Sequence, residues 1–211
     1  MKLSMRLMLC SLLLFICVIA LGYAVTAGWF LDFDLAVSHA LNMERGTSPD
    51  WLIWFMQGVS WLGGGVQRYI MVIILTFALW RWWGWGAGLA MGLTSLASAF
   101  TSDALKLFFG RVRPDLVMQL DPINSPAFPS GHTNNAAVVY ILFIILVPQA
   151  RHPVWQMAAF VMIVFTGLSR IMLGVHWPTD VIGGWMLGAA FALAAAAVIM
   201  RRQHDRERKI L

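Results

Sequence analysis

Long apolar runs recur along the whole chain and constrain its fold more than any other feature. A helix needs about 20 mostly apolar residues to cross the hydrocarbon core of a bilayer, and the sequence predicts six such helices. They cover residues 6–28, 66–82, 86–106, 132–149, 154–172 and 181–200. Hydrophobic residues make up 60% of the 211 residues and charged residues 12%, which is too apolar for a soluble domain of this length. We therefore expect an all-α, polytopic membrane protein with a single transmembrane domain over residues 1–211.

The first apolar run also resembles a secretory signal, because Lys2 and Arg6 precede it and Val25-Thr26-Ala27 could be a cleavage site. The run from Leu7 to Ala27 is longer than the usual core of a signal, and further spans follow it. A first transmembrane span is therefore the favoured interpretation.

The segment between the first two predicted spans, residues 31–65, has a different pattern. Its first half is polar, and aromatic residues then recur at near-helical spacing at Trp51, Trp54, Phe55 and Trp61. We expect one or two helices that lie in the membrane interface. The alternative is a seventh, short span at 51–65.

The distribution of Lys and Arg predicts the orientation. With six spans both termini share one side, which carries nine basic residues: Lys2, Arg6, Arg81, Arg151, Arg201, Arg202, Arg206, Arg208 and Lys209. The other side carries six: Arg45, Arg68, Lys106, Arg111, Arg113 and Arg170. We expect both termini in the cytoplasm. Tryptophans 80, 82, 83, 85 and 155 would then form an inner belt, and tryptophans 29, 51, 54, 61 and 177 an outer one.

The net charge of +5 is divided among short loops and the C-terminal tail, so a nucleic-acid partner is not expected. The two cysteines, Cys10 and Cys17, lie on one helix about 10 Å apart along its axis, too far for a disulfide. They are also too few for a four-ligand metal site.

Three polar clusters interrupt the apolar pattern, each at the outer end of a span or in an outer loop. The first runs from Lys106 through Arg111 and Arg113 to Pro114. Basic side chains near headgroups commonly snorkel, but a cationic run on the outer side opposes the positive-inside rule and favours an anion site.

The second cluster, Phe128-Pro129-Ser130-Gly131-His132-Thr133, enters the fourth span. Backbone N–H groups at a helix N-terminus can bind an anion. The alternative is simple helix capping, in which Ser130 or Thr133 is the cap and His132 lies at the interface.

The third cluster, from Ser169-Arg170 to His176 and Asp180, lies between the last two spans. Pro178 and Asp180 suit the first turn of a helix. A functional role for Asp180 is to accept a hydrogen bond from His176 and fix its tautomer. This requires the last helix to begin near His176.

Together the clusters provide cations, neutral donors, two histidines and one carboxylate, which are the groups that phosphoryl transfer uses. Lys106-x6-Arg113-Pro114, Pro129-Ser130-Gly131-His132 and Ser169-Arg170-x5-His176-x3-Asp180 resemble the complete signature of the type 2 phosphatidic-acid phosphatase superfamily. That superfamily also includes vanadium haloperoxidases and acid phosphatases. The predicted spans favour a lipid substrate, and enzymes of this size in the family are bacterial lipid phosphatases.

The resemblance implies a role for each matching residue. His176 would be the nucleophile that forms phosphohistidine, Asp180 would orient it, and His132 would be the general acid. The phosphate would be held by Lys106, Arg113, Ser130, Gly131 and Arg170. Arg111 lies outside the signature and would be a headgroup contact or a surface residue. The family needs no metal or other cofactor, and no carboxylate cluster accompanies the motifs.

The expected partners are a membrane lipid substrate and the bilayer, with no obligate protein partner. Undecaprenyl pyrophosphate, phosphatidylglycerol phosphate and phosphatidic acid all fit a site at the outer face of a bacterial inner membrane, and the first is slightly favoured. A lipid-to-lipid phosphotransferase that uses the same histidine remains an alternative. A non-catalytic lipid carrier is a further one, although such a protein would not need an intact signature.

Overall fold

The computed structural model describes residues 2–210, so the ends of the expected domain, Met1 and Leu211, lie outside the described residues. Over that range the chain is all-helical and has no strand. The α-helices are α1 (Lys2–Thr26), α2 (Leu31–Leu41), α3 (Asp50–Gly63), α4 (Gly65–Trp83), α5 (Trp85–Phe109), α6 (Gly131–Leu146), α7 (Pro153–Met172) and α8 (Pro178–Ile210). A short 3₁₀-helix, η1 (Pro148–Arg151), precedes α7.

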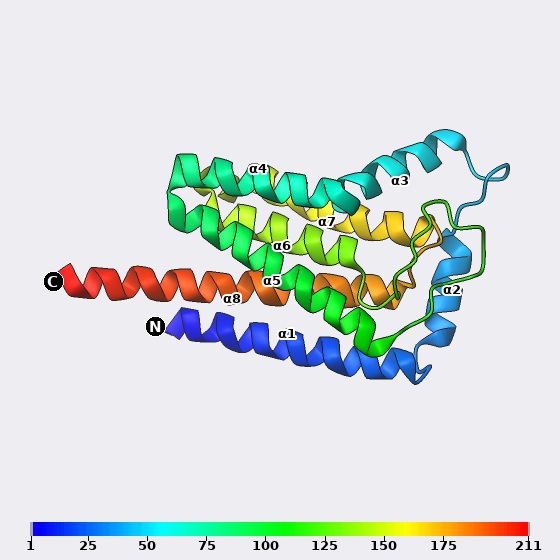
Figure 1. Ribbon diagram of the computed structural model, residues 1–211, viewed down its shortest axis with the longest axis horizontal. Coiled ribbons are helices and arrows are strands. Elements are labelled where there is room, and N and C mark those ends of the chain that lie inside the picture. Colours follow the sequence, from blue (N-terminus) through cyan, green and yellow to red (C-terminus); the bar gives the residue numbers. More distant parts are fainter. Residues whose placement is uncertain (1, 211) are drawn as a thin grey trace.

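Helix α6 lies in the middle of the bundle and packs against α5, α7 and α8, while α1 runs along α8 and α4 pairs with α5 (Figure 1). The two termini lie at one end of the bundle. Helix α2 and the long loop between α5 and α6 lie at the opposite end (Figure 1). Close packing of α6 and α8 depends on small residues: a β-carbon on Gly188 would meet the carbonyl oxygen of Asn134 at 2.5 Å.

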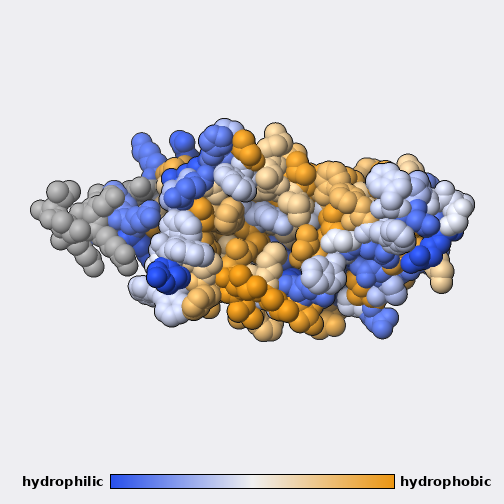
Figure 2. All heavy atoms as spheres, turned by 90° about the horizontal axis from the view of Figure 1, so that it is seen from above, coloured by the Kyte–Doolittle hydropathy of each residue, from blue (hydrophilic) through white to orange (hydrophobic). Residues whose placement is uncertain are grey.

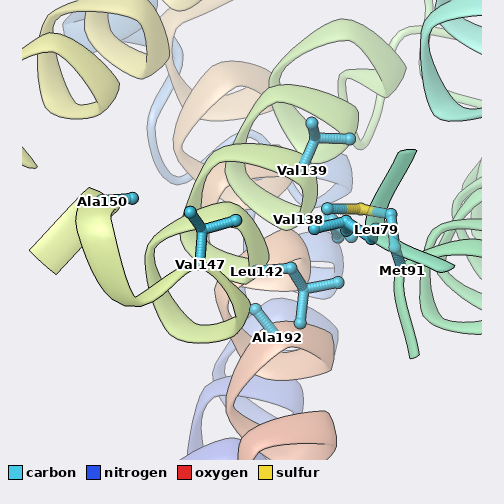
Figure 3. Packing of buried hydrophobic residues seen from close by; sticks show 8 residues of the cluster. All are labelled: Leu79, Met91, Val138, Val139, Leu142, Val147, Ala150 and Ala192. Carbon is cyan, nitrogen blue, oxygen red and sulfur yellow. The ribbon is translucent and has the colours of Figure 1, made fainter. Parts of the chain in front are cut away.

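The buried apolar cluster with the most residues combines side chains of α4, α5, α6 and α8. Val138, Val139 and Leu142 of α6 contact Leu79 of α4, Met91 of α5 and Ala192 of α8 (Figure 3). Because this cluster joins four helices, it holds α6 at a fixed height in the bundle, and with it the second polar motif at the start of α6.

Each of the six predicted spans corresponds to one helix, with differences at the ends. The predicted fourth span, 132–149, is too long, because α6 ends at Leu146. Val147 precedes Pro148, and a residue before proline is disfavoured in the α conformation. Helix α8 extends beyond the predicted end at 200 to Ile210, since the polar tail contains no helix-breaking residue.

Three helices are by themselves long and apolar enough to cross a membrane: α1, α7 and the part of α8 from Pro178 to Asp205. A fourth candidate is the pair α3 and α4, bent by 54° at their junction. Helix α5 has 25 residues and is long enough to cross a membrane. It is not among these candidates because Gly, Ser and Thr make it less hydrophobic. Helix α6 has only 16 residues.

A hydrophobic band crosses the middle of the molecule, with hydrophilic residues at both ends (Figure 2). These features fit an integral membrane protein; six full crossings remain a prediction.

The segment 31–65 contains two helices, α2 and α3, within the expected one or two. Their position in the membrane interface stays a prediction. Helix α3 has 14 residues, which is short for a seventh crossing on its own. Helix α1 contributes Val18 and Val25 to a buried cluster with Leu187 of α8. It is therefore an integral part of the bundle, which favours the span over the cleaved-signal interpretation.

Candidate active site

A polar cavity of about 360 Å³ lies at the end of the bundle opposite the termini. Five of the residues predicted from the motifs line it: Lys106, Arg113, Gly131, His132 and His176. The other three, Ser130, Arg170 and Asp180, are fully buried beside or behind these. The structure therefore brings together the three motifs, which span residues 106–180 of the sequence.

His176 and Asp180 meet as their spacing predicts, because α8 begins at Pro178 between them. The Nδ1 atom of His176 lies 3.4 Å from Oδ2 of Asp180. The same carboxylate oxygen accepts a hydrogen bond from the backbone N–H of Trp177 at 2.9 Å. Asp180 thus combines the two roles considered from sequence: it caps the first turn of α8 and faces the imidazole.

Arg113 lies beside the opposite nitrogen of the same ring. Its Nη1 is 3.1 Å from Nε2 of His176 and also donates to the carbonyl oxygen of Val175 at 2.5 Å. Its Nε donates to the carbonyl oxygen of Ser125 at 2.7 Å. Lys106, in the last turn of α5, donates to the carbonyl oxygen of Pro126 at 2.9 Å. The loop carbonyls therefore aim both cations at the cavity.

The second motif forms the start of α6, where Ser130 is the N-cap and Gly131 the first helical residue. The backbone N–H of Ser130 donates to the carbonyl oxygen of Asp180 at 3.0 Å, which joins the start of α6 to the start of α8. The Ser130 hydroxyl is buried and has no partner among the described residues. The side-chain capping considered from sequence is therefore absent for Ser130 in the described structure.

His132 packs against the break between α3 and α4. A β-carbon on Gly64 would overlap the Nε2 end of the His132 ring, and one on Gly63 would lie 3.8 Å from the His132 β-carbon. The glycines thus leave room for the imidazole at the cavity wall. The Gly63-Gly64-Gly65 run is visible in the sequence, but its contact with His132 is not.

Arg170 is fully buried in the last part of α7. Its Nη1 donates to the Ser60 hydroxyl of α3 and, at 2.5 Å, to Oδ2 of Asp121. Its Nε and Nη2 atoms have no partner among the described residues. Buried donors are normally satisfied, so two unpartnered donors on one buried guanidinium are unusual.

The position of Arg111 differs from both alternatives expected from the sequence, a headgroup contact or a surface residue. It is neither a surface residue nor lining for the cavity, since its side chain is 9% exposed and lies between two buried carboxylates. It donates to Oδ2 of Asp34 at 2.6 Å and to Oδ1 of Asp180 at 2.5 Å. Asp34, on α2, also accepts from the backbone and hydroxyl of Thr179. In the sequence, one signal indicated a buried partner: Arg111 is a cation on the predicted outer side, against the positive-inside rule.

Burial, and then the positive charges of Arg113, Lys106 and Arg170, lower the pKa of His176 well below its ordinary value. The imidazole is therefore neutral at pH 7. Burial is also the main cause that lowers the pKa of Arg113, to about 10. Burial raises the pKa of Asp121, but the hydrogen bond and charge of Arg170 outweigh it, so the net shift is downward.

The sequence matches the PAP2 superfamily over residues 83–204, more than half of the chain. The chain belongs to the PAP2 superfamily. It is 33% identical over 181 residues to phosphatidylglycerophosphatase B of Bacillus subtilis, covering 83% of this chain and 87% of that protein. It is 33% identical over 85 residues to an undecaprenyl-diphosphatase of Sulfolobus acidocaldarius, covering 38% and 37%.

Among solved structures, the fold resembles the crystal structure of a transmembrane PAP2-type phosphatidylglycerolphosphate phosphatase from Bacillus subtilis. The TM-score is 0.79 at 29% identity, over 90% of this chain and 96% of that one. The family recognised from the three motifs is therefore confirmed. The family match and the names of these relatives also support the prediction of a lipid phosphate hydrolase.

Proposed function

We propose that this protein hydrolyses a membrane lipid phosphate or pyrophosphate through a phosphohistidine on His176. The observation that carries this proposal is the placement of the two nitrogens of one ring. Nδ1 faces Asp180, while Nε2 faces the cavity beside Arg113. With Nδ1–H donated to the carboxylate, Nε2 carries the lone pair that attacks phosphorus, once the Arg113 Nη1–H that lies 3.1 Å from it turns to the phosphoryl oxygens.

In the first step, Nε2 of His176 attacks the phosphorus, and the bond from phosphorus to the leaving oxygen breaks. His132 donates a proton to that oxygen. Charge on the phosphoryl oxygens is stabilised by Lys106 and Arg113. The unpaired donors of Arg170 and Ser130 supply further hydrogen bonds.

In the second step, water attacks the phosphohistidine. His132, now neutral, accepts a proton from the water, the N–P bond breaks, and inorganic phosphate leaves. The proton balance closes over the two steps, because His132 gives one proton and regains one. Neither step requires a metal ion, and we propose that the enzyme is metal-independent.

The candidate substrates are undecaprenyl pyrophosphate, phosphatidylglycerol phosphate and phosphatidic acid. The similarity to phosphatidylglycerophosphatase B and to an undecaprenyl-diphosphatase supports both lipid monophosphates and lipid diphosphates as substrates.

We infer that both termini lie in the cytoplasm of a bacterium and that the site faces the periplasm or exterior. The site lies at the end of the bundle opposite the termini (Figure 1), and more basic residues share the side of the termini.

Release of inorganic phosphate from the three lipids by purified protein in detergent, with excess EDTA, tests the proposal. His176→Ala is assayed in parallel. Release that survives EDTA and is lost in His176→Ala is expected. Wild-type release that stops with EDTA would contradict the metal-independent mechanism. Full turnover by His176→Ala would contradict the phosphohistidine. Radiolabelled phosphate that moves to an added lipid acceptor, without release, would instead identify a phosphotransferase.

A further inference from the structure

An apolar groove lies beside the polar cavity and shares two of its lining residues. The groove has a volume of about 530 Å³ and lies between α4 and α5. Its apolar lining includes Val72, Ile73, Phe77, Leu89, Leu93 and Leu96. Arg68 and Tyr69, near the start of α4, line both the cavity and the groove. These two residues therefore mark the boundary between a polar and an apolar binding region.

Arg68 is placed to bind an anion at this boundary. Its Nη2 donates to the Tyr69 hydroxyl at 2.5 Å, and its guanidinium carbon lies 4.5 Å from the centre of the Tyr69 ring. Its Nε is buried without a partner, and no ion pair among the described residues includes it. Within the described residues the guanidinium thus makes no ion pair, and a neighbouring tyrosine holds it in place.

The other end of the guanidinium points toward the phosphate site. A β-carbon on Gly131 would lie 3.3 Å from Nη1 of Arg68 and 3.8 Å from Cε of Lys106. Arg68 and Lys106 therefore approach the start of α6 from two helices, with the absent side chain of Gly131 leaving space between them. Arg68 is outside the three motifs, and it lies on the groove side of this space.

The order of groups along this path matches the order of groups in a lipid diphosphate. The phosphorus that His176 attacks must lie beside Nε2 in the cavity, and the apolar chain fits the groove. In a diphosphate a second phosphate lies between these two parts, whereas in a monophosphate a single ester oxygen does. A bidentate guanidinium at the boundary suits that second phosphate.

We propose that Arg68, supported by Tyr69, binds the phosphate that stays on the lipid, and that it makes the enzyme selective for lipid diphosphates over lipid monophosphates. This inference rests on the proposed function. During transfer the bond from the terminal phosphorus to the bridging oxygen breaks and the N–P bond to His176 forms. The bridging oxygen leaves on the lipid monophosphate, whose increasing negative charge Arg68 stabilises.

The test compares kcat/KM for farnesyl diphosphate and farnesyl monophosphate, which share one chain, in the same detergent. The ratio of the two values is the readout. Arg68→Gln should lower the ratio about 10- to 100-fold, the effect of losing a charge-assisted contact made in the transition state. Arg68→Lys should give an intermediate ratio, because a point charge replaces the fork. Arg81→Gln, the same substitution at an exposed position near the other end of α4, should keep the wild-type ratio.

A ratio for Arg68→Gln within about two-fold of the wild type would overturn the proposal, as would a wild type that prefers the monophosphate. If Arg68→Gln does not fold, as judged by its thermal transition, an unchanged ratio in Arg68→Lys would overturn it instead. Failure of the proposed function gives a different result, in which wild type releases phosphate from neither lipid or His176→Ala releases it from both.

Discussion

Asp34 on α2 and Asp180 on α8 accept hydrogen bonds from one guanidinium, that of Arg111, and both carboxylates are fully buried. The bond to Asp180 measures 2.5 Å, whereas the distance from Asp180 to His176 is 3.4 Å. Arg111 therefore holds the carboxylate that faces the candidate nucleophile. Through Arg111, the site is connected to α2, whose Asp34 lies 77 residues from Arg111 along the chain.

Asp34→Asn should reduce kcat about 10-fold with little change in KM, a loss in the range seen for residues that support a reacting group. Without the charge of Asp34, Arg111 is balanced only by Asp180 and draws it away from His176. Steady-state kinetics on a lipid phosphate checks this. Asp32→Asn, on an exposed face of the same helix, is the matched control. Wild-type kcat in Asp34→Asn would show that the network does not position His176.

Asp180→Asn should fold but lower kcat about 10³-fold or more, as loss of the orienting carboxylate does in other histidine-dependent hydrolases. The amide oxygen can still accept from the N–H of Trp177, so the first turn of α8 keeps its cap. The NH₂ group, however, cannot accept the Nδ1–H of His176. Thermal denaturation separates folding from catalysis, and Asp115→Asn in the exposed loop is the control. Near-normal turnover by Asp180→Asn would remove the tautomer argument.

Gly64→Ala should lower turnover by displacing His132, because the new β-carbon would overlap the ring. We expect a loss of about 100-fold on a lipid monophosphate, the usual size of a general-acid contribution. Gly58→Ala is the control, since a β-carbon there meets no atom within 4 Å. Equal activity of the two variants would mean that His132 is not held by the α3–α4 break.

Arg113→Gln should move the acidic limb of the kcat/KM profile to higher pH. Burial and the charge of Arg113 lower the pKa of His176 in the folded enzyme, so the neutral, reactive form persists below pH 6.5. Removing the cation raises this pKa toward its ordinary value, so protonation then inactivates the enzyme at a higher pH. Arg113→Lys keeps a charge and should leave the limb near its wild-type position, at a lower rate.

Profiles of wild type, Arg113→Gln and Arg113→Lys on one substrate provide this measurement, because the ionisation of the substrate is then common to all three. An acidic limb that stays in place in Arg113→Gln would show that burial alone sets the pKa of His176.

The buried Arg111 network also predicts a stability effect. Arg111→Gln leaves two buried carboxylates without their shared cation and should destabilise the protein by about 3–5 kcal/mol. The thermal transition in detergent measures this loss. Simultaneous replacement of both acids, in Asp34→Asn with Asp180→Asn, should recover part of it, since no uncompensated carboxylate then remains. Additive losses in the triple variant would contradict the charge argument.

The apolar runs by themselves determined the helices, because a long hydrophobic segment has few alternatives to a helix in a bilayer. They placed α4 and α5 within a few residues of their observed bounds. The meeting of His176 and Asp180 could also be predicted, since a separation of four residues near a helix start is set by local geometry. The end of α6 was missed by three residues, although Pro148 marks it.

The sequence by itself therefore determined the helical composition, the family and the residues of the three motifs, because these depend on local periodicity and on short spacings. Only the tertiary structure decided that Arg111 lies between Asp34 and Asp180, that Gly64 accommodates His132, and that Arg68 joins the cavity to the groove. Asp34 and Arg111 are 77 residues apart in the chain. No short-range pattern encodes such a contact, because helix packing alone brings those side chains together.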